Sequence, residues 1–366
     1  LMGKERGYQL QSQLHRIENL ICKVPVRIAI SATFSNDIGS VASYLRSGSV
    51  HKNCQIITSD QHTTSALAVK IMGYNIPHIA GEEPRLIPQL MHDDAINRVA
   101  KDIYRLLRGK NNLVFTNSRS DTEQLANNLR ELCHADRVPE EFFPHHGSLS
   151  KELRETLEHR LIDGRLPTTA ICTSTLELGI DINDVQSIAQ FAPPTSVASL
   201  RQRLGRSGRR DGRAVLRLFI PENEPIINRM SSLLCEDTVL SAASVNLLLR
   251  RWYEPPLQKE YAFSTLIQQT LSVIASNGSV SAKNLYELLC KTGPFSLTTP
   301  AMYAQLLRAL GENDLIVQMQ DGTLTLGLEG ESLVSNYEFF ASFNNNREYR
   351  VDHDGKTIGR IPLLTS

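Results

Sequence analysis

Long apolar runs and paired cysteines are both missing from this 366-residue chain. No stretch approaches the roughly 18 apolar residues that a transmembrane helix needs, so the sequence predicts no membrane span and no membrane partner. The six cysteines are scattered and none forms a C-x-x-C pair, which argues against a disulfide framework or a zinc knuckle. With no secretory signal at the start, free thiols in a reducing compartment are expected, and we predict a cytoplasmic or nucleoid-associated protein.

Net charge of one sign is also missing, because 39 basic and 39 acidic residues cancel. The overall balance therefore argues neither for nor against a nucleic-acid partner, and only local charge is informative. Seven arginines and one aspartate between residues 201 and 217 give that segment a local charge of +6. A solvated basic face is one interpretation. The glycines interleaved with the arginines argue against it, because glycine is a poor helix former and permits close backbone approach.

Strand and helix patterns alternate for about 110 residues up to residue 220, which predicts a doubly wound α/β domain with a parallel sheet. Before it, a strand at 26–30, a helix at about 36–46 and a possible strand at 55–58 suggest part of another parallel sheet. The predicted strands cover residues 26–30, 112–116, 142–143, 169–173, 185–192 and 214–220. The predicted helices cover residues 7–20, 90–108, 120–132, 150–162 and 197–209.

The chain changes character after residue 221. Helical patterns cover residues 224–252, 263–276, 281–290 and 300–310. Two short strands then flank Asp321-Gly322, a strong hairpin signal. Three helices followed by a hairpin predict a winged helix of the α+β class. A second hairpin around Asp354-Gly355 predicts the start of a further β-rich domain.

Polar residues follow the predicted strands, where ligands bind in such sheets. Ser31-Ala32-Thr33 follows the strand at 26–30, although small hydroxyl residues there are usually a turn. Residues 115–119 (FTNSR) place hydrogen-bond donors before a helix, and an ordinary helix cap with a surface arginine is the alternative. The segment His145-His146-Gly147-Ser148 precedes another helix. Paired histidines raise the possibility of a metal, but without a nearby third ligand an anion at the helix N-terminus is favoured.

Taken in order, these segments resemble the motifs of superfamily-two helicases. Ser31–Thr33 resembles motif III, residues 115–119 motif IV, and residues 173–181 (TSTLELGID) motif V. Residues 202–209 have the Q-x-x-G-R-x-G-R pattern of motif VI. The sequence H-H-G-S-L-S-K-E followed by T-S-x-L-E-L-G-I-D-I is similar to that of the large helicase-related (Lhr) branch of these helicases. In that branch a winged helix and a β-rich domain follow, and the resemblance covers about residues 5–335.

The resemblance implies that ATP binds between two RecA-like domains. It assigns Arg206 and Arg209 as arginine fingers, Gln202 to the γ-phosphate, and Gly179 and Asp181 to the nucleotide. It assigns the backbone of one nucleic-acid strand to Asn117, Ser118, Arg119, His146, Gly147, Thr173 and Ser174. Ser31 and Thr33 are implied to couple the two sites, and no residue is assigned to a metal.

The implied fold is a RecA-like doubly wound parallel sheet, with the second motor domain complete and the first partial, followed by a winged helix. The expected boundaries are residues 1–80 for the end of the first motor domain and 81–222 for the second. A helical linker is expected at 223–256. It is followed by the winged helix at 257–335 and by the start of a β-rich domain at 336–366.

Two elements of such helicases are absent from the sequence: the G-x-x-x-x-G-K-[ST] phosphate loop and an Asp-Glu pair for Mg²⁺. Gly355-Lys356-Thr357 lacks the upstream glycine, and His92-Asp93-Asp94 lies on a predicted helix. In the family the Asp-Glu pair lies shortly before the position of Arg6-Gly7. We therefore expect the Mg²⁺ ligands upstream of residue 1, and we expect this polypeptide alone to be inactive.

The predicted function is an ATP-dependent translocase or helicase that holds single-stranded or duplex nucleic acid through its backbone. DNA is the expected partner, but the sequence does not separate DNA from RNA. One alternative is an ATP-switched clamp or remodeller that does not unwind. The other is a winged-helix binding module with an inactive motor. The sequence does not separate these readings, and it leaves translocation polarity and pathway open.

Overall fold

The computed structural model describes residues 5–21, 25–31, 33, 44–45, 55–57, 66–76, 87–177, 185–207, 213–223, 234–255, 261–341, 348–353 and 356–362. The chain divides into two units, Leu1–Thr58 with Pro255–Asn346 and Ser59–Glu254 with Arg347–Ser366. Each unit has a hydrophobic core of its own. None of the helices within these described ranges is long and apolar enough to cross a membrane.

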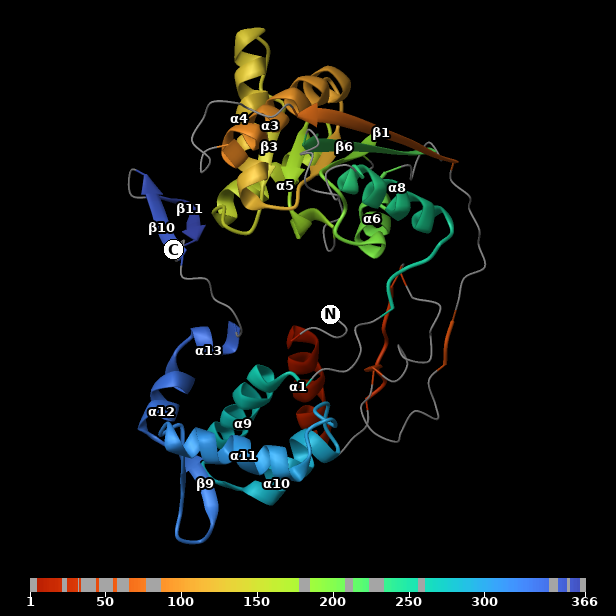
Figure 1. The fold of residues 1–366 in the computed structure, drawn as a ribbon. Helices are drawn as coiled ribbons and strands as arrows, with labels where there is room; N and C mark the ends of the chain where they lie inside the picture. The colour runs from red at the N-terminus through yellow and green to blue at the C-terminus, as the bar shows by residue number, and fades with distance from the viewer. Residues whose placement is uncertain are drawn as a thin grey trace. The chain divides into compact units, whose positions relative to one another are not determined.

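The larger unit is built on a six-stranded sheet in the order β1-β6-β5-β2-β4-β3, and every neighbouring pair is parallel (Figure 1). The strands are β1 (Ala66–Ile76), β2 (Asn112–Phe115), β3 (Phe142–His145), β4 (Thr169–Cys172), β5 (Ser187–Phe191) and β6 (Arg213–Asn223). The helices are α3 (Ile87–Leu107), α4 (Arg119–Ala135), α5 (Lys151–Asp163), α6 (Val197–Leu204) and α8 (Glu236–Leu249). The predicted doubly wound parallel sheet is confirmed.

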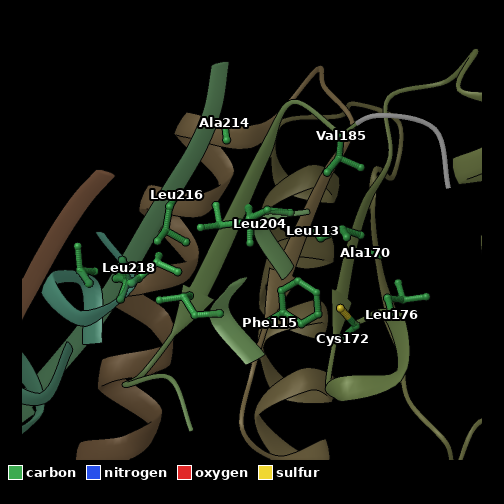
Figure 2. Packing of buried hydrophobic residues seen from close by; sticks show 14 of the residues in the cluster. Leu113, Phe115, Ala170, Cys172, Leu176, Val185, Leu204, Ala214, Leu216 and Leu218 are labelled. Carbon is green, nitrogen blue, oxygen red and sulfur yellow. The ribbon is translucent and has the colours of Figure 1, made fainter. Parts of the chain in front are cut away.

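The central strands are apolar because helices cover both faces of a parallel sheet. Every residue of β2, β4 and β5 is buried. Figure 2 shows Phe115, Cys172 and Leu216 among the side chains that pack on one face, together with Leu176 and Leu204 from outside the strands. A second cluster formed with α3 and α4 fills the other face.

Helix boundaries in this unit follow local capping. The hydroxyl of Ser118 accepts a hydrogen bond from the backbone N–H of Asp121 at 3.0 Å and so begins α4. Ser150 caps α5 in the same way through Leu153. Gly164 ends α5 with a φ of 63°, a conformation that glycine adopts without strain.

The helix predicted over residues 197–209 is shorter than expected. α6 ends at Leu204, Gly205 is its C-cap, and the chain then turns so that Ser207 forms a parallel bridge with Val185. The sequence reasoning placed Arg206 on this helix, three residues before Arg209, and that placement is wrong. Gly205 lowers the helix propensity at this point, and the pairing of Ser207 with Val185 directs the backbone away from the helix.

Strand β1 was not foreseen. It pairs with β6 over its full length, from Ala66 opposite Arg213 to Ile76 opposite Asn223, and lies beside β6 in Figure 1. The domain scheme from the sequence placed these residues before the boundary at 81, in the first motor domain. In the structure they extend the sheet of the second and cover an edge of β6 that would otherwise be open.

The smaller unit has the element order of a winged helix (Figure 1). Its core elements are α9 (Phe263–Asn277), β7 (Val280–Ser281), α10 (Ala282–Tyr286) with a π-turn (Glu287–Lys291), α11 (Pro300–Glu312), β8 (Ile316–Gln318) and β9 (Thr323–Leu326). The helices α12 (Leu328–Ser335) and α13 (Glu338–Ala341) follow. The predicted helices and the Asp321-Gly322 turn, with Gly322 at a φ of 81°, are confirmed.

Helix α1 (Glu5–Ile21) belongs to this smaller unit and packs on α9. Arg16 donates to Gln269 at 3.2 Å and to Ser272 at 3.0 Å, and Tyr8 stacks on Phe295. The sequence scheme assigned α1 to the first motor domain. In the structure it contacts the winged-helix elements, and it also contacts the N-terminal segment through Gln11 with Tyr44 and Glu18 with Arg27.

The strand predicted at residues 26–30 is absent. Val26, Ile28 and Ile30 are 88%, 81% and 92% exposed, and residues 25–31 form no ladder with any other described strand. A strand exists only with a partner for its backbone groups, so an apolar pattern alone does not create one. The second predicted hairpin is confirmed as β10 (Glu348–His353) and β11 (Lys356–Pro362), which pair antiparallel.

Candidate functional site

The carboxyl edge of the sheet gathers the residues that the resemblance assigns to a nucleic-acid backbone. Because β2, β3, β4 and β5 are parallel, the segments that follow them leave the sheet at the same edge. Asn117 follows β2, His146 and Gly147 follow β3, and Thr173 and Ser174 follow β4. Sequence spacing alone had placed them within about 60 residues of chain, and the strand order brings them to one edge.

Asn117 is exposed but its side-chain amide is held at both ends. Its Nδ2 donates to the carbonyl oxygen of Pro193 at 2.9 Å, and its Oδ1 accepts from Nε2 of Gln190 at 3.4 Å. The loop after β2 is thereby tied to β5 and the loop after β5. Ser118 uses its hydroxyl as the α4 cap, and the Arg119 side chain is exposed, as that of Asn117 is.

His145 and His146 are both buried, at 1% and 5% exposure, and have separate partners. Nε2 of His145 lies 3.0 Å from Glu158, and Nδ1 lies 2.8 Å from the hydroxyl of Thr175. Burial lowers the pKa of His145 below its usual value, and Glu158 opposes that effect. The loops after β3 and β4 are joined through this ring.

His146 is oriented by Glu123 on α4. Its Nε2 lies 2.5 Å from the Glu123 carboxylate, and its Nδ1 accepts from the backbone N–H of Ser148 at 3.3 Å. The imidazole was expected to touch a nucleic-acid strand. In the structure both ring nitrogens already have protein partners, so its contribution is to shape the loop in which Gly147 is exposed.

Thr173 and Ser174 begin the short 3-10 helix that follows β4 (Ser174–Leu176). Ser174 is exposed and Thr173 half-buried, so both side chains are open to solvent at the edge. No group of three or more His, Cys, Asp or Glu side chains in the described part of the chain has a geometry that would hold a metal ion.

Arg203 was missed by the sequence reasoning, which counted it only as one of a run of arginines. It is 3% exposed, and its guanidinium lies 4.6 Å above the ring of Phe115. Its Nε donates to Oε1 of Glu177 at 2.8 Å, and its Nη1 donates to Oε1 of Gln190. A signal existed, because residue 203 lies on the helix stripe of Leu200 and Leu204, where an arginine requires a buried acceptor.

Glu177 contacts two residues of α6, Ser199 and Arg203, and Arg206 in the turn after it. Its carboxylate also accepts from the hydroxyl of Ser199 at 2.8 Å, and its backbone carbonyl accepts from Nη2 of Arg206 at 3.0 Å. Arg206 is half-buried, as is Gln202 on the preceding helix. The predicted arginine finger is therefore anchored to the segment of motif V.

Three of the predicted nucleotide residues, Gly179, Asp181 and Arg209, lie outside the described residues. Ser31 and Thr33 are described in the smaller unit. There the Ser31 hydroxyl lies 3.3 Å from that of Thr33 and accepts from the backbone N–H of Thr33 at 3.1 Å. That arrangement is the local turn which was the alternative for this segment.

A groove of about 470 Å³ opens beside Asn117. Its walls are the loop after β5, the start of α6, one side of α8, and Glu254. The carboxylate of Glu254 accepts from the backbone N–H groups of Val197 at 2.6 Å and Ala198 at 3.0 Å, and Ser196 caps Ser199 at 3.0 Å. The N-terminus of α6 is thus fully satisfied by acceptors from its own chain.

Comparison with known proteins shows which proteins this chain is similar to. Residues 96–211 match the helicase conserved C-terminal domain. The ATP-dependent helicase Lhr-Core of Saccharolobus solfataricus is 32% identical over 57% of this chain and 22% of its own length. The Lhr helicase/uracil glycosylase of Escherichia coli is 27% identical over 88% of this chain and 21% of its own length. The chain therefore spans about a fifth of these relatives.

Among solved structures, the Mycobacterium smegmatis helicase Lhr bound to ssDNA and AMP-PNP is similar in fold, with a TM-score of 0.68 and 26% identity. The likeness covers 91% of this chain and 41% of that one. The ordered motifs, the parallel sheet and these likenesses agree, and the chain resembles superfamily-two helicases of the Lhr-like branch, with a helicase conserved C-terminal domain at residues 96–211.

Proposed function

We propose that this chain provides the second motor domain and a winged helix of an ATP-dependent nucleic-acid translocase or helicase. The observation that carries the proposal is the joint placement of Asn117, Gly147 and Ser174 at one sheet edge, with Arg206 anchored to the same motif V segment through Glu177. One end of the arrangement suits a nucleic-acid backbone. The other offers a guanidinium to a phosphate.

The strand-binding end would hold phosphate and sugar and would not read bases. Asn117, Arg119 and Ser174 are exposed polar side chains, and Gly147 presents backbone close to the N-terminus of α5. Such contacts position a strand without reporting its sequence. DNA is the favoured partner because the similar Mycobacterium smegmatis helicase Lhr was solved with ssDNA.

The nucleotide-binding end would consist of Arg206 and Gln202, with Gly179, Asp181 and Arg209 assigned by resemblance. A guanidinium matches the spread negative charge of a transferring phosphoryl group. ATP hydrolysis would supply the free energy for movement. This chain supplies only part of a site for ATP and Mg²⁺. Its sequence has no phosphate loop, and its described residues form no cluster that would hold a metal ion. The phosphate loop and the Mg²⁺ ligands would come from a partner motor domain.

The test compares Arg206→Ala with wild type in a protein that unites this chain with a phosphate-loop domain. We expect ATP turnover to fall about 10³-fold or more, the usual loss on removing an arginine finger. Nucleotide-free strand binding should stay within about threefold, because Arg206 points at Glu177. Arg201→Ala is the matched control, since Arg201 is exposed on α6, shortly before the turn that carries Arg206. Unchanged turnover in Arg206→Ala would remove the assignment.

A strand-displacement assay on the same protein tests the activity itself. Displacement that requires ATP supports a translocase or helicase. Nucleotide-dependent binding without displacement would instead support an ATP-switched clamp, the alternative function that the same motifs serve.

A further inference from the structure

A chain of buried polar contacts crosses the larger unit from Arg206 to Asn117. Its centre is Arg203, whose guanidinium lies over Phe115 and donates to Glu177 on one side and to Gln190 on the other. Arginine suits this place because its planar fork can make two directed hydrogen bonds while its face stacks on an aromatic ring.

At the Glu177 end, the carboxylate and the backbone carbonyl of one residue serve different partners. The carboxylate is fixed by Ser199 and Arg203, and the carbonyl accepts from Arg206. Moving α6 would therefore move Glu177, and moving Glu177 would redirect the guanidinium of Arg206.

At the other end, Gln190 is fully buried on β5 and uses both halves of its amide. Its oxygen accepts from Arg203, and its nitrogen donates to the carbonyl of Phe191 at 2.8 Å and to Asn117 at 3.4 Å. The amide of Gln190 thus joins the buried arginine to an exposed residue of the strand-binding edge.

We infer that Arg203 and Gln190 are positioning residues that couple the nucleotide end of the site to its strand-binding end. This inference rests on the proposed function and adds residues that the motif resemblance does not assign. Neither side chain reaches ATP or nucleic acid, because both are buried. They act by holding Arg206 and Asn117 in one rigid polar frame, where low dielectric strengthens each contact.

The decisive variant is Gln190→Glu. It keeps the shape and the oxygen that accepts from Arg203, but it cannot donate to Asn117. The measurement is strand affinity with and without a non-hydrolysable ATP analogue, in the protein that unites this chain with a phosphate-loop domain. Coupling between two sites is reciprocal and commonly amounts to about 5- to 150-fold in affinity.

In wild type we expect the analogue to change strand affinity by about tenfold. In Gln190→Glu the ratio of strand affinity with the analogue to strand affinity without it should fall to within about twofold of unity. The affinity without nucleotide should stay within about threefold of wild type. Gln186→Glu, at an exposed glutamine just before β5, should keep the wild-type ratio. A wild-type ratio in Gln190→Glu would overturn the inference.

Arg203→Lys provides a second variant if Gln190→Glu does not fold, as judged by thermal unfolding. Lysine keeps the charge but cannot serve Glu177 and Gln190 together. We expect kcat for ATP to fall by about tenfold or more while KM for ATP stays within about threefold, because the residue acts through Arg206. Arg201→Lys is the control, and equal changes in kcat and KM would count against positioning. If wild type itself shows no strand-stimulated ATP turnover, the proposed function fails, whatever the variants show.

Discussion

His145 connects two loops of the sheet edge through one buried ring. Its Nε2 lies 3.0 Å from Glu158 on α5, and its Nδ1 lies 2.8 Å from the hydroxyl of Thr175 in motif V, which itself donates to the His145 carbonyl oxygen at 3.1 Å. Burial lowers the pKa of this ring, so the folded chain disfavours its protonation. The consequence is a stability that depends on pH.

We predict that the free energy of unfolding falls as pH drops below about 6.5, the ordinary histidine pKa. The folded-state pKa of His145 is lowered, so the unfolded chain takes up a proton that the folded chain resists. Replacing it by His145→Gln should reduce this slope by up to about 1.4 kcal/mol per pH unit. Urea unfolding of the chain between pH 5 and pH 8, as an approximate range around that pKa, measures it.

The exposed His159 on α5 offers the control for this measurement. His159→Gln should leave the wild-type slope in place, and it controls for the loss of an imidazole at an exposed position. Equal slopes in wild type and His145→Gln would show that this ring does not contribute to the pH dependence.

At the scale of single residues, the sequence offers roles for exposed groups, which stay predictions, and does not show the contacts of buried ones. Asn117 and Gly147 could be assigned because they follow strands and resemble motif positions. The roles of Arg203 and Gln190 depend on a cation over Phe115 and an acceptor on β5, contacts between segments far apart in the chain. His146 resembles a strand-binding residue in sequence, yet both its nitrogens have protein partners.

Among the elements, α6 depends most on a residue outside itself. Glu254 lies far downstream and accepts from the first two backbone N–H groups of the helix. We predict that Glu254→Gln lowers the free energy of unfolding by about 1 kcal/mol, because the amide loses one acceptor oxygen and the negative charge near a helix N-terminus. Urea unfolding tests this.

Glu131→Gln, an exposed carboxylate on α4, is the comparison for charge loss alone. It should change the unfolding free energy by no more than about 0.5 kcal/mol. A Glu254→Gln effect no larger than that of Glu131→Gln would mean that the α6 cap contributes nothing measurable.

Helix α11 of the winged-helix unit exposes a face poor in base-reading groups. Its exposed residues include Ala301, Ala304, Gln305 and Arg308. The turn between β8 and β9 carries Asp321, whose pKa is lowered by hydrogen bonds from the Thr323 hydroxyl and backbone, so this turn keeps a negative charge. Neither surface suits recognition of bases.

We therefore predict that strands of equal length and unrelated sequence bind within a few-fold of one another at fixed salt. Fluorescence anisotropy with labelled strands of different sequence gives the comparison. A preference of about 10³ or more for one sequence would place this unit among specific readers of DNA.

Elements were easier to predict than their partners. The periodic patterns located α3, α4, α5, α9 and α11, because apolar residues recur at helical spacing along the buried face of each helix. They did not reveal that β1 pairs with β6, that α1 packs on α9, or that residues 26–30 lack a ladder. Strand pairing and helix packing depend on contacts between segments far apart in the chain, and the pattern within one segment does not predict them.

For the whole chain we predict no ATP hydrolysis by residues 1–366 alone, with or without nucleic acid. An arginine finger accelerates a reaction only when other groups hold the phosphates, and this sequence lacks the phosphate loop. A coupled phosphate-release assay on the purified chain checks this. Strand-stimulated turnover at the rate of a protein that contains the loop would contradict the prediction.

The pairing of β1 with β6 has a consequence for how the molecule is made. During synthesis β1 emerges before every other strand of its sheet, yet its partner is the last, so it must wait until β6 has left the ribosome. Contacts between ends so distant in sequence are slow to close, and an unpaired strand is prone to aggregate in the meantime. A version shortened to the matched helicase segment, residues 96–211, would lack both strands and leave β5 as a bare edge. Expression boundaries for this domain should therefore begin upstream of Ala66 and end beyond Asn223.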